Sequence, residues 1–251
     1  MDLELLKIRL HKLAVAFAHP QCWSALADGV APSAEHMAVL RTLTVDGIID
    51  AGANRGQFSL ACRVALPSVP IVAFEPIPAE AATFRRVHGK YAGIRLIESA
   101  LGETRGTATL HLSQSADSSS LLPIGRRQNE LFRNTAEVGT LVVPVQRLDD
   151  LATQWAGRRH QLLKLDVQGF ELNVLRGAVE TLRSCTYVYA ECSEVALYDG
   201  QALHSEVASF LQGAGFRQTG RFNSQLRMGQ LIQADYLFVN ERPIPAGAAI
   251  T

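Results

Sequence analysis

A glycine turn within residues 45–57, VDGIIDAGANRGQ, carries the residue types that point most directly to chemistry. The apolar pair Ile48–Ile49 is typical of a buried strand, and Asp50 places a carboxylate at the end of that strand. Gly52 and Gly56 allow the backbone to turn sharply and to approach a ligand closely. The pattern Asp-x-Gly-x-Asn-x-Gly therefore predicts a strand, a tight turn and a helix that together bind a nucleotide-like ligand.

The spacing within this turn separates two ligand classes. A dinucleotide site needs Gly-x-Gly-x-x-Gly to hold a pyrophosphate, but Asn54 and Gln57 occupy the second and third glycine positions counted from Gly52. An acidic turn also repels a phosphate, whereas it attracts a ligand with an ammonium group and a sulfonium charge. S-adenosylmethionine is such a ligand.

A second carboxylate favours the same cofactor. The run Ile71–Pro76, IVAFEP, predicts the next parallel strand, with Glu75 at its end, where an acidic side chain accepts hydrogen bonds from both ribose hydroxyls. NAD-binding proteins use the same arrangement, so only the combination with Asp50 discriminates. A third strand is expected over 94–99, and residues 98–102, ESALG, are expected to border the adenine ring.

Two later strands are also expected to end in carboxylates, at Asp166 in QLLKLDVQGFE and at Glu191 in TYVYAEC. Both face the same crevice if the sheet is parallel, because ligands bind where the strand order reverses. If the acceptor is an alcohol, as the family resemblance described below implies, a general base is needed, for which Asp166 and Glu191 are the candidates and His111 is a weaker third choice. Either carboxylate is alternatively a ligand for the cofactor's amino group or for a divalent cation. No metal site is otherwise indicated.

The alternation of strand and helix breaks over residues 107–148. The runs TATLHL and LVVPVQRL alternate as exposed strands do, and a long polar stretch separates them. Such an insertion is typical of a lid or a mobile loop, and we expect a lid that carries acceptor determinants. Ser119 and Ser120 are expected to contact ligand oxygens, while Arg126 and Arg127 either meet an acidic acceptor or are solvated.

The remaining pattern predicts one α/β domain, a Rossmann-like class I methyltransferase fold. We expect a mostly parallel seven-stranded sheet, helices on both faces, and an antiparallel edge hairpin formed by strands at 215–221 and 235–240 with an irregular link between them. The expected divisions are a helical extension (1–44), a methyltransferase domain (45–240, with the insertion at 107–148) and a flexible tail (241–251).

The extension begins with an amphipathic helix over 2–17, which is expected to pack on the domain edge or on another copy of the chain. A membrane-surface role is disfavoured because the cationic cluster is short and tryptophan is absent from its apolar face. A second helical region is expected over 21–44.

Composition excludes several classes of function. The 251 residues are 47% hydrophobic, and 24 basic residues balance 24 acidic ones, so no global positive field is available to bind nucleic acid. The four cysteines lack Cys-x-x-Cys spacing, and neither a membrane-spanning run nor a secretory signal is evident. These features predict a cytoplasmic protein and disfavour a nucleic-acid substrate.

Taken together, the motifs resemble those of FkbM-type S-adenosylmethionine-dependent methyltransferases from about Asp46 to Asn240. The resemblance rests on IDAGANRGQ (49–57), FEP (74–76), SALG (99–102), SSSL (118–121), VQRLDDL (145–151) and, most specifically, LLKLDVQGFELNVLRGA (162–178). It implies methyl transfer to a hydroxyl group, often of a sugar or a polyketide-type product. The residues expected to bind the cofactor are Asp50, Gly52, Asn54, Gly56, Glu75, Pro76, Ser99, Ala100 and Asp166; those expected to bind the acceptor are Ser119, Ser120 and Glu191.

Three other functions compete with O-methyl transfer. A non-catalytic S-adenosylmethionine-binding protein would share the whole scaffold, since the sequence specifies the cofactor site better than the base. An NAD-dependent oxidoreductase would need the phosphate-binding glycines that this turn lacks. A nucleic-acid methyltransferase would show an Asn/Asp-Pro-Pro-Tyr-like motif or a basic surface.

Overall fold

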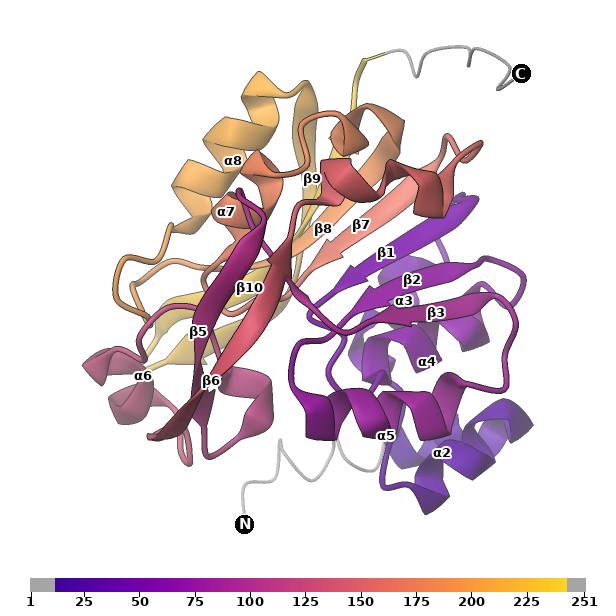
Figure 1. Cartoon of the computed structure of the whole chain (residues 1–251), viewed down its shortest axis with the longest axis horizontal. Coiled ribbons are helices and arrows are strands. Elements are labelled where there is room, and N and C mark those ends of the chain that lie inside the picture. Colours follow the sequence, from indigo (N-terminus) through magenta and orange to yellow (C-terminus); the bar gives the residue numbers. More distant parts are fainter. Residues whose placement is uncertain (1–11, 243–251) are drawn as a thin grey trace.

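A seven-stranded sheet forms the centre of the computed structural model, which describes residues 12–242 (Figure 1). The strand order is β3-β2-β1-β7-β8-β10-β9. Neighbours pair in parallel from β3 to β8, and β10 runs antiparallel to both β8 and β9. This arrangement confirms the mostly parallel, Rossmann-like sheet. The strands are β1 (Gly47–Ala51), β2 (Ile71–Phe74), β3 (Ile94–Ile97), β7 (Gln161–Leu165), β8 (Cys185–Ser193), β9 (Phe216–Arg227) and β10 (Gln230–Asn240).

Helices cover both faces of the sheet, because every central strand is apolar on both sides. On one side, the α4 face, α3 (Met37–Leu40), α4 (Gln57–Ala65) and α5 (Pro78–His88) pack against alternate residues such as Ile48 and Leu162. On the other, the α8 face, α7 (Glu171–Arg176) and α8 (His204–Gly213) pack against Ile49 and Leu163. The two faces thus take successive residues of each strand.

The N-terminal region packs on the α4 face as a series of short helices. These are a helix over 12–18, η1 (Pro20–Cys22), α2 (Trp23–Ala27), η2 (Ala34–His36) and α3. Most of the amphipathic helix expected over 2–17 lies outside the described residues, as does nearly all of the tail expected over 241–251. The second helical region is interrupted between α2 and η2.

The insertion forms a second, three-stranded sheet of order β4-β6-β5. Its strands are β4 (Ala100–Leu101), β5 (Gly106–Ser113) and β6 (Glu137–Gln146), and between the last two lie η3 (Ala116–Ser118) and α6 (Arg126–Leu131). Tyr198 contacts the polar stretch, because its hydroxyl oxygen lies 3.0 Å from the Ser118 carbonyl oxygen. Figure 1 shows β5 and β6 beside the carboxyl ends of the central strands.

Two expected element boundaries were wrong. The irregular link expected at 222–234 is instead strand, since β9 and β10 continue to a tight turn at Met228 and Gly229. Both turn residues have positive φ, as two-residue hairpin turns require, but the flanking strand is too exposed and polar to show alternation. The helix expected over 173–182 ends at Arg176, and residues near its expected end belong to a 3-10 helix, η5 (Thr181–Ser184). Another 3-10 helix, η4 (Leu148–Trp155), precedes β7.

The cysteines and the helices bear on the expectations drawn from composition. All four cysteines are buried and free. No helix within residues 12–242 is long and apolar enough to cross a bilayer.

Candidate active site

The carboxyl ends of the central strands bring ionisable side chains together on the α4 face. The register pairs Asp50 of β1 with Lys164 of β7, and Glu191 of β8 with Asp235 of β10. The strand order reverses between β1 and β7, which is where open parallel sheets bind ligands. The site therefore lies at the topological switch point.

Lys164 is the electrostatic centre of this row. Its Nζ lies 3.3 Å from Asp50 Oδ1, 3.4 Å from Asp166 Oδ2 and 3.2 Å from the Gly52 carbonyl oxygen, to which it donates. Burial opposes its charge, but Asp166 and Asp50 outweigh burial and raise the Lys164 pKa above its ordinary value. Lys164 is thus a permanent cation that joins the ends of β1 and β7. Lys164 was not among the site residues expected from the sequence, although a lysine inside the apolar strand LLKL is itself a signal of buried acidic partners.

The structure places Asp50 beneath the site. Its side chain is fully buried, where Oδ2 accepts a hydrogen bond from Ser59 Oγ at 2.7 Å and Oδ1 faces Lys164. Lys164 offsets part of the Asp50 charge and is shared with Asp166, so the repulsion of a phosphate by Asp50 stays a prediction. Asp50 acts on the site through Lys164.

The two glycines of the turn have different roles. A Cβ on Gly52 would lie 1.9 Å from the Asp166 carbonyl oxygen, so Gly52 lets the turn after β1 touch the end of β7. A Cβ on Gly56 would lie 2.3 Å from His88 Nε2, and its φ is +90°. Gly56 therefore packs the turn against α5.

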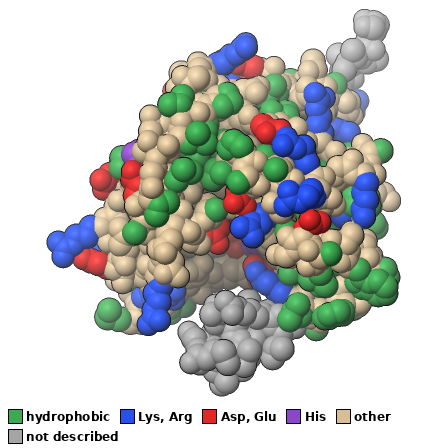
Figure 2. Space-filling model, turned by 60° about the horizontal axis from the view of Figure 1, so that its bottom comes forward, with side chains coloured by type: hydrophobic (Ala, Val, Ile, Leu, Met, Phe, Trp, Pro, Cys, Tyr) green, Lys and Arg blue, Asp and Glu red, His purple; other side chains and the backbone are tan. Residues whose placement is uncertain are grey.

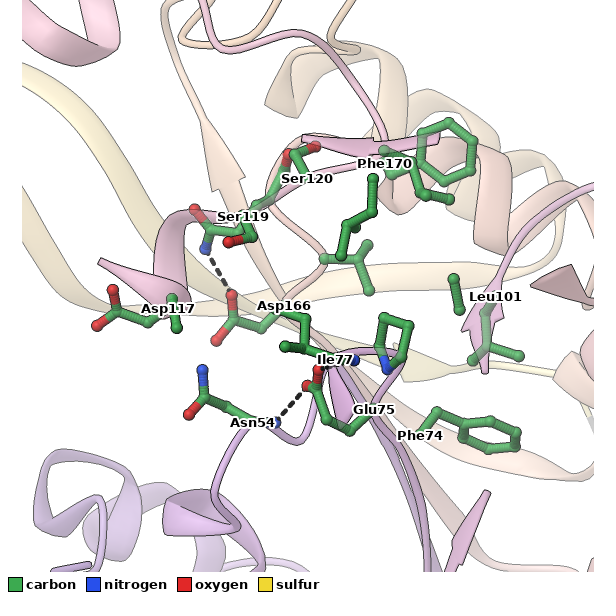
Figure 3. Close-up of a pocket in the computed structure, with 18 of the residues that line it drawn as sticks. Asn54, Phe74, Glu75, Ile77, Leu101, Asp117, Ser119, Ser120, Asp166 and Phe170 are labelled. Carbon is green, nitrogen blue, oxygen red and sulfur yellow. Dashed lines mark hydrogen bonds between the residues drawn. The ribbon is translucent and has the colours of Figure 1, made fainter. Parts of the chain in front are cut away.

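A narrow cavity of about 90 Å³ lies above β2 and β4 (Figure 3). Glu75 is at its floor, where Oε2 accepts the Asn54 amide and Oε1 accepts the Ile77 amide, each at 2.8 Å. Burial raises the pKa of Glu75 to about 7, although the two amides oppose that shift. Each oxygen keeps a lone pair for a ligand hydroxyl. The lining includes the expected cofactor residues Gly52, Asn54, Glu75, Pro76, Ser99, Ala100 and Asp166.

The donor set of this narrow cavity fits a nucleoside. The apolar side chains of Phe74, Leu101 and Phe170 flank it, as an adenine ring requires. Ser99 is fully buried, and its Oγ has no hydrogen-bond partner within residues 12–242, so it remains free for a base nitrogen. Glu75 supplies the acceptor for a ribose diol.

The serines expected to bind the acceptor line this same narrow cavity. Ser119 Oγ accepts the Ser113 amide at 3.1 Å, and Ser120 Oγ donates to the Gln168 carbonyl at 2.6 Å. The Ser120 bond ties the insertion to the turn after β7, whereas the Ser119 bond lies within the insertion. Figure 3 shows both serines above Asp166, on the insertion side.

A wider cleft of about 880 Å³ opens from the same point. It shares Gly52, Asn54, Asp117 and Asp166 with the narrow cavity and extends over β8 and the β9–β10 hairpin. Figure 2 shows acidic and basic side chains close together around the hollow on that face. The two cavities thus meet at Asp166.

Asp166 and Glu191, the two carboxylates expected to be catalytic, are bridged by one amide. Gln168 Nε2 donates to Asp166 Oδ1 at 2.7 Å and to Glu191 Oε2 at 3.0 Å, and Gln233 Nε2 donates to Glu191 Oε1 at 3.1 Å. Burial, with the nearby Asp166 and Asp235 carboxylates, raises the pKa of Glu191 well above its ordinary value. Gln168 is itself fixed by Tyr198, whose hydroxyl donates to Gln168 Oε1 at 2.7 Å. Each carboxylate oxygen therefore already has a partner.

A histidine from the N-terminal region completes the wider cleft, although no motif points to it. His36 Nδ1 lies 3.1 Å from Tyr189 Oη and 3.5 Å from Asp235 Oδ2. Asn223 Nδ2 donates to the same Asp235 oxygen at 2.7 Å. Burial lowers the pKa of His36, and the Asp235 carboxylate opposes that shift.

The remaining side chains that the sequence suggested for the site have other contacts. His111 pairs with Glu137 on the insertion sheet at 3.0 Å, and the exposed Arg126 pairs with Glu130 at 2.6 Å. Glu171 is buried, and its Oε1 accepts the amides of Val167 and Gly169, which fixes the turn after Asp166. Within residues 12–242, no group of three or more His, Cys, Asp or Glu side chains is arranged to hold a metal ion.

The sheet order, with an antiparallel strand between β8 and β9, and the two cavities meeting at the switch point define an S-adenosylmethionine-dependent methyltransferase of class I architecture. Residues 50–218 match the methyltransferase FkbM domain, and the chain belongs to that family.

Named relatives agree with this family. The chain is 29% identical over 160 residues to the 2-O-methyltransferase NoeI of Sinorhizobium fredii, a match that covers 61% of this chain and 66% of that protein. It is 30% identical to Methyltransferase 1 of Beauveria bassiana, with 66% and 68% covered. It is 29% identical to the 31-O-demethyl-FK506 methyltransferase FkbM of Streptomyces tacrolimicus, with 68% and 72% covered. The chain thus spans about two thirds of the length of these relatives.

Proposed function

We propose that this chain transfers a methyl group from S-adenosylmethionine to a hydroxyl group of a sugar, a glycan or a hydroxylated natural product. The observation that carries the proposal is the junction at Asp166, where a narrow cavity lined by groups that suit a nucleoside meets a wide polar cleft. The two relatives whose names specify a reaction, NoeI and FkbM, are both named for oxygen methylation.

Different residues of the narrow cavity would contact different parts of the cofactor. Glu75 would accept the ribose hydroxyls, Ser99 would contact the adenine, and Asn54 and Asp166 would meet the amino-acid end. The bound cofactor supplies a methyl group already activated by its sulfonium. The protein's task is then to hold an acceptor oxygen in line and to exclude water.

The wide cleft supports a hydroxyl-rich acceptor. Its lining alternates carboxylates with amides and cations, including Glu191, Asn223 and Arg227, and such groups match the donors and acceptors of a polyol. The N-terminal residues Ser33 and Glu35 also line it, so we propose that the region before β1 belongs to the same functional unit.

Calorimetry with S-adenosylmethionine, S-adenosylhomocysteine and NAD tests the cofactor. We expect binding of both sulfur ligands and none of NAD, and we expect Glu75→Ala to abolish it. Glu103→Ala is the matched control, because that carboxylate is half exposed and pairs with Arg176 on the surface. Binding of NAD, with no binding of either sulfur ligand, would instead favour the NAD-dependent oxidoreductase.

Catalysis is tested by S-adenosylhomocysteine release with methyl hexopyranosides and polyhydroxylated macrolides as acceptors. We expect product with hydroxyl acceptors and a mass gain of one methylene group. Cofactor binding without turnover on any of these compounds would favour the non-catalytic alternative.

A further inference from the structure

Gln168, two residues beyond Asp166, is the point at which the turn after β7 meets three other segments of the chain. Its Nε2 donates to Asp166 Oδ1 at 2.7 Å and to Glu191 Oε2 at 3.0 Å, so both amide hydrogens are used. Its Oε1 accepts the Tyr198 hydroxyl at 2.7 Å, and its backbone carbonyl accepts the Ser120 hydroxyl at 2.6 Å. Both polar atoms of the side chain are therefore engaged.

The backbone at Gln168 is held in an unusual conformation. Its φ is +53°, in the left-handed region that side chains other than asparagine and aspartate rarely adopt. Glu171 Oε1 accepts the amides of Val167 and Gly169 on either side of it. Such conformations persist only where the surroundings determine them, and they cluster at active sites and ligand clamps. Since glycine would adopt this backbone without strain, the glutamine points to a role for its side chain.

We propose that Gln168 is a positioning residue for methyl transfer, whose side-chain amide holds the carboxyl groups of Asp166 and Glu191 in fixed relation across the junction of the two cavities. This inference rests on the proposed function. Asp166 lines both cavities, whereas Glu191 lines the wide cleft. The bridge therefore joins a residue that would meet the cofactor to one that would meet the acceptor.

A neutral donor suits this position. When both carboxyl groups are ionised they repel each other, and two charge-assisted hydrogen bonds from one nitrogen offset that repulsion. A lysine or an arginine would also offset it, but would cancel negative charge where the ammonium and sulfonium groups of the proposed cofactor are expected. Gln168 holds both groups without changing the charge at the junction. The remaining lone pairs of Asp166 and Glu191 stay available to ligands.

The short contacts determine which end of the amide faces the carboxyl groups. Asp166 pairs with Lys164 as a carboxylate and can only accept, so the atom 2.7 Å from its Oδ1 is the amide nitrogen. The amide oxygen then faces Tyr198, whose pKa is raised mainly by burial, so that its hydroxyl stays protonated and donates. The nitrogen keeps its second hydrogen for Glu191.

The contact with the insertion uses the backbone of Gln168 and not its side chain. Ser120 is 1% exposed and donates to the backbone carbonyl. Substitutions of the side chain therefore remove the bridge and leave this contact with the insertion in place. The role of the bridge can thus be tested separately from the position of the insertion.

The bridge can be observed without any acceptor. In ¹H–¹⁵N spectra of the full chain, the side-chain NH₂ pair of Gln168 is assigned as the pair absent from Gln168→Glu. We expect both protons to lie downfield of those of an exposed glutamine and to exchange more slowly with water, because each is hydrogen-bonded to a carboxyl oxygen. Shifts and exchange rates equal to those of the exposed Gln212 would overturn the proposal.

Two variants that keep the length of the side chain test its role in turnover. Gln168→Met removes both donors, and Gln168→Glu replaces them by a carboxyl group that donates only when protonated. With methyl hexopyranosides as acceptors and saturating S-adenosylmethionine, we expect either substitution to lower kcat at pH 8 by about 10²-fold, the effect of a displacement of about 1 Å. Circular dichroism and the urea midpoint, compared with wild type, show that each variant is folded.

The pH dependence separates positioning from a merely structural role. The charged groups around the bridge are the carboxyl groups of Asp166, Glu191, Glu171 and Asp235 and the ammonium of Lys164. Because acidic groups outnumber the cation, the new carboxyl group of Gln168→Glu should have a pKa above that of an ordinary glutamate, and its protonation should restore one donor as the pH falls. The kcat of Gln168→Glu, relative to wild type at the same pH, should therefore rise about tenfold from pH 8 to pH 6, whereas that of Gln168→Met should not.

Gln233→Met is the matched comparison. Gln233 donates to Glu191 at 3.1 Å but has no hydrogen bond with Asp166 among residues 12–242, so its loss should lower kcat much less than Gln168→Met. Gln212→Glu, at an exposed position of α8, should leave kcat unchanged at every pH. Equal losses in Gln168→Met and Gln233→Met would overturn the positioning role, as would a Gln168→Glu variant that does not recover at low pH.

Failure of the proposed function has a different signature. A wild-type protein that binds S-adenosylhomocysteine but methylates no hydroxyl probe would overturn both the function and the positioning role. Turnover by wild type with an unchanged kcat in Gln168→Met and Gln168→Glu would overturn the positioning role alone and leave O-methyl transfer standing.

Discussion

Removing the charge of Lys164 is the sharpest test of how the strand ends are held. Lys164→Met keeps most of the side-chain volume and leaves Asp50, which is fully buried, with Ser59 as its remaining partner. Breaking a buried ion pair by deleting one partner costs about 3–5 kcal/mol, because the other charge stays buried. Asp166 is 37% exposed, so its share of that cost is only about 0–1 kcal/mol.

Urea denaturation at pH 8 measures the effect as a free energy of unfolding. We expect Lys164→Met to lose about 3–5 kcal/mol. The double variant Lys164→Met/Asp50→Asn should recover at least about 2 kcal/mol of that loss, since the amide leaves no buried charge. Lys90→Met is the control, because Lys90 donates only to Ser24 at the surface, and it should stay within about 0.5 kcal/mol of wild type.

Two results would refute this account. One is a Lys164→Met variant within about 1 kcal/mol of wild type, which would mean that water reaches Asp50. The other is strict additivity of the two substitutions, which would mean that Lys164 and Asp50 do not interact.

Three further predictions concern the turn and the insertion. Since Glu75 has a pKa of about 7 and must be ionised to accept both ribose hydroxyls, S-adenosylhomocysteine should bind about tenfold more tightly at pH 8 than at pH 6 by calorimetry. Glu75→Gln should remove that pH dependence. Gly56→Ala should lower the unfolding free energy by about 1–3 kcal/mol more than Gly157→Ala, because both have positive φ but only the first Cβ meets another atom within 4 Å among the described residues. Equal losses of unfolding free energy in the two variants would show that the His88 side chain moves aside for the new methyl group. Tyr198→Phe removes the hydroxyl that contacts Ser118 and Gln168, so trypsin should cleave the insertion at Arg126 and Arg127 faster than in wild type.

The strands and the cofactor site were predictable because their signals are local. Apolar runs such as IVAF and LLKL specify strands buried on both faces, and each ends in a polar residue at the same edge of a parallel sheet. The end of β9 was not predictable, since RFNSQLR is exposed and is held by backbone pairing with β10. Strand formation there depends on a partner that the residues themselves do not specify.

The wide cleft was not predictable because its residues meet only through tertiary packing. His36 and Tyr189 are separated by 153 positions, and Asp235 comes from the last strand. No spacing rule links residues that different elements bring to one place. By contrast, Gln168 lies two residues from Asp166, inside the most specific motif. Its side chain bridges Asp166 and Glu191, and one half of that bridge therefore joins residues that are neighbours in the sequence.

The same charges that hold the strand ends also set the chemistry above them. The single positive charge of Lys164 offsets part of the combined negative charge of Asp50 below the site and Asp166 within it, so the junction between the cavities carries less negative charge than its carboxylates alone would give. Burial lowers the His36 pKa, and the Lys164 charge adds to that shift, against the carboxylates of Asp235, Glu35 and Asp166. An uncharged substitute at 164 would therefore raise the His36 pKa as well as weaken the fold. A shift of the His36 titration in a folded Lys164→Met sample would separate these two effects.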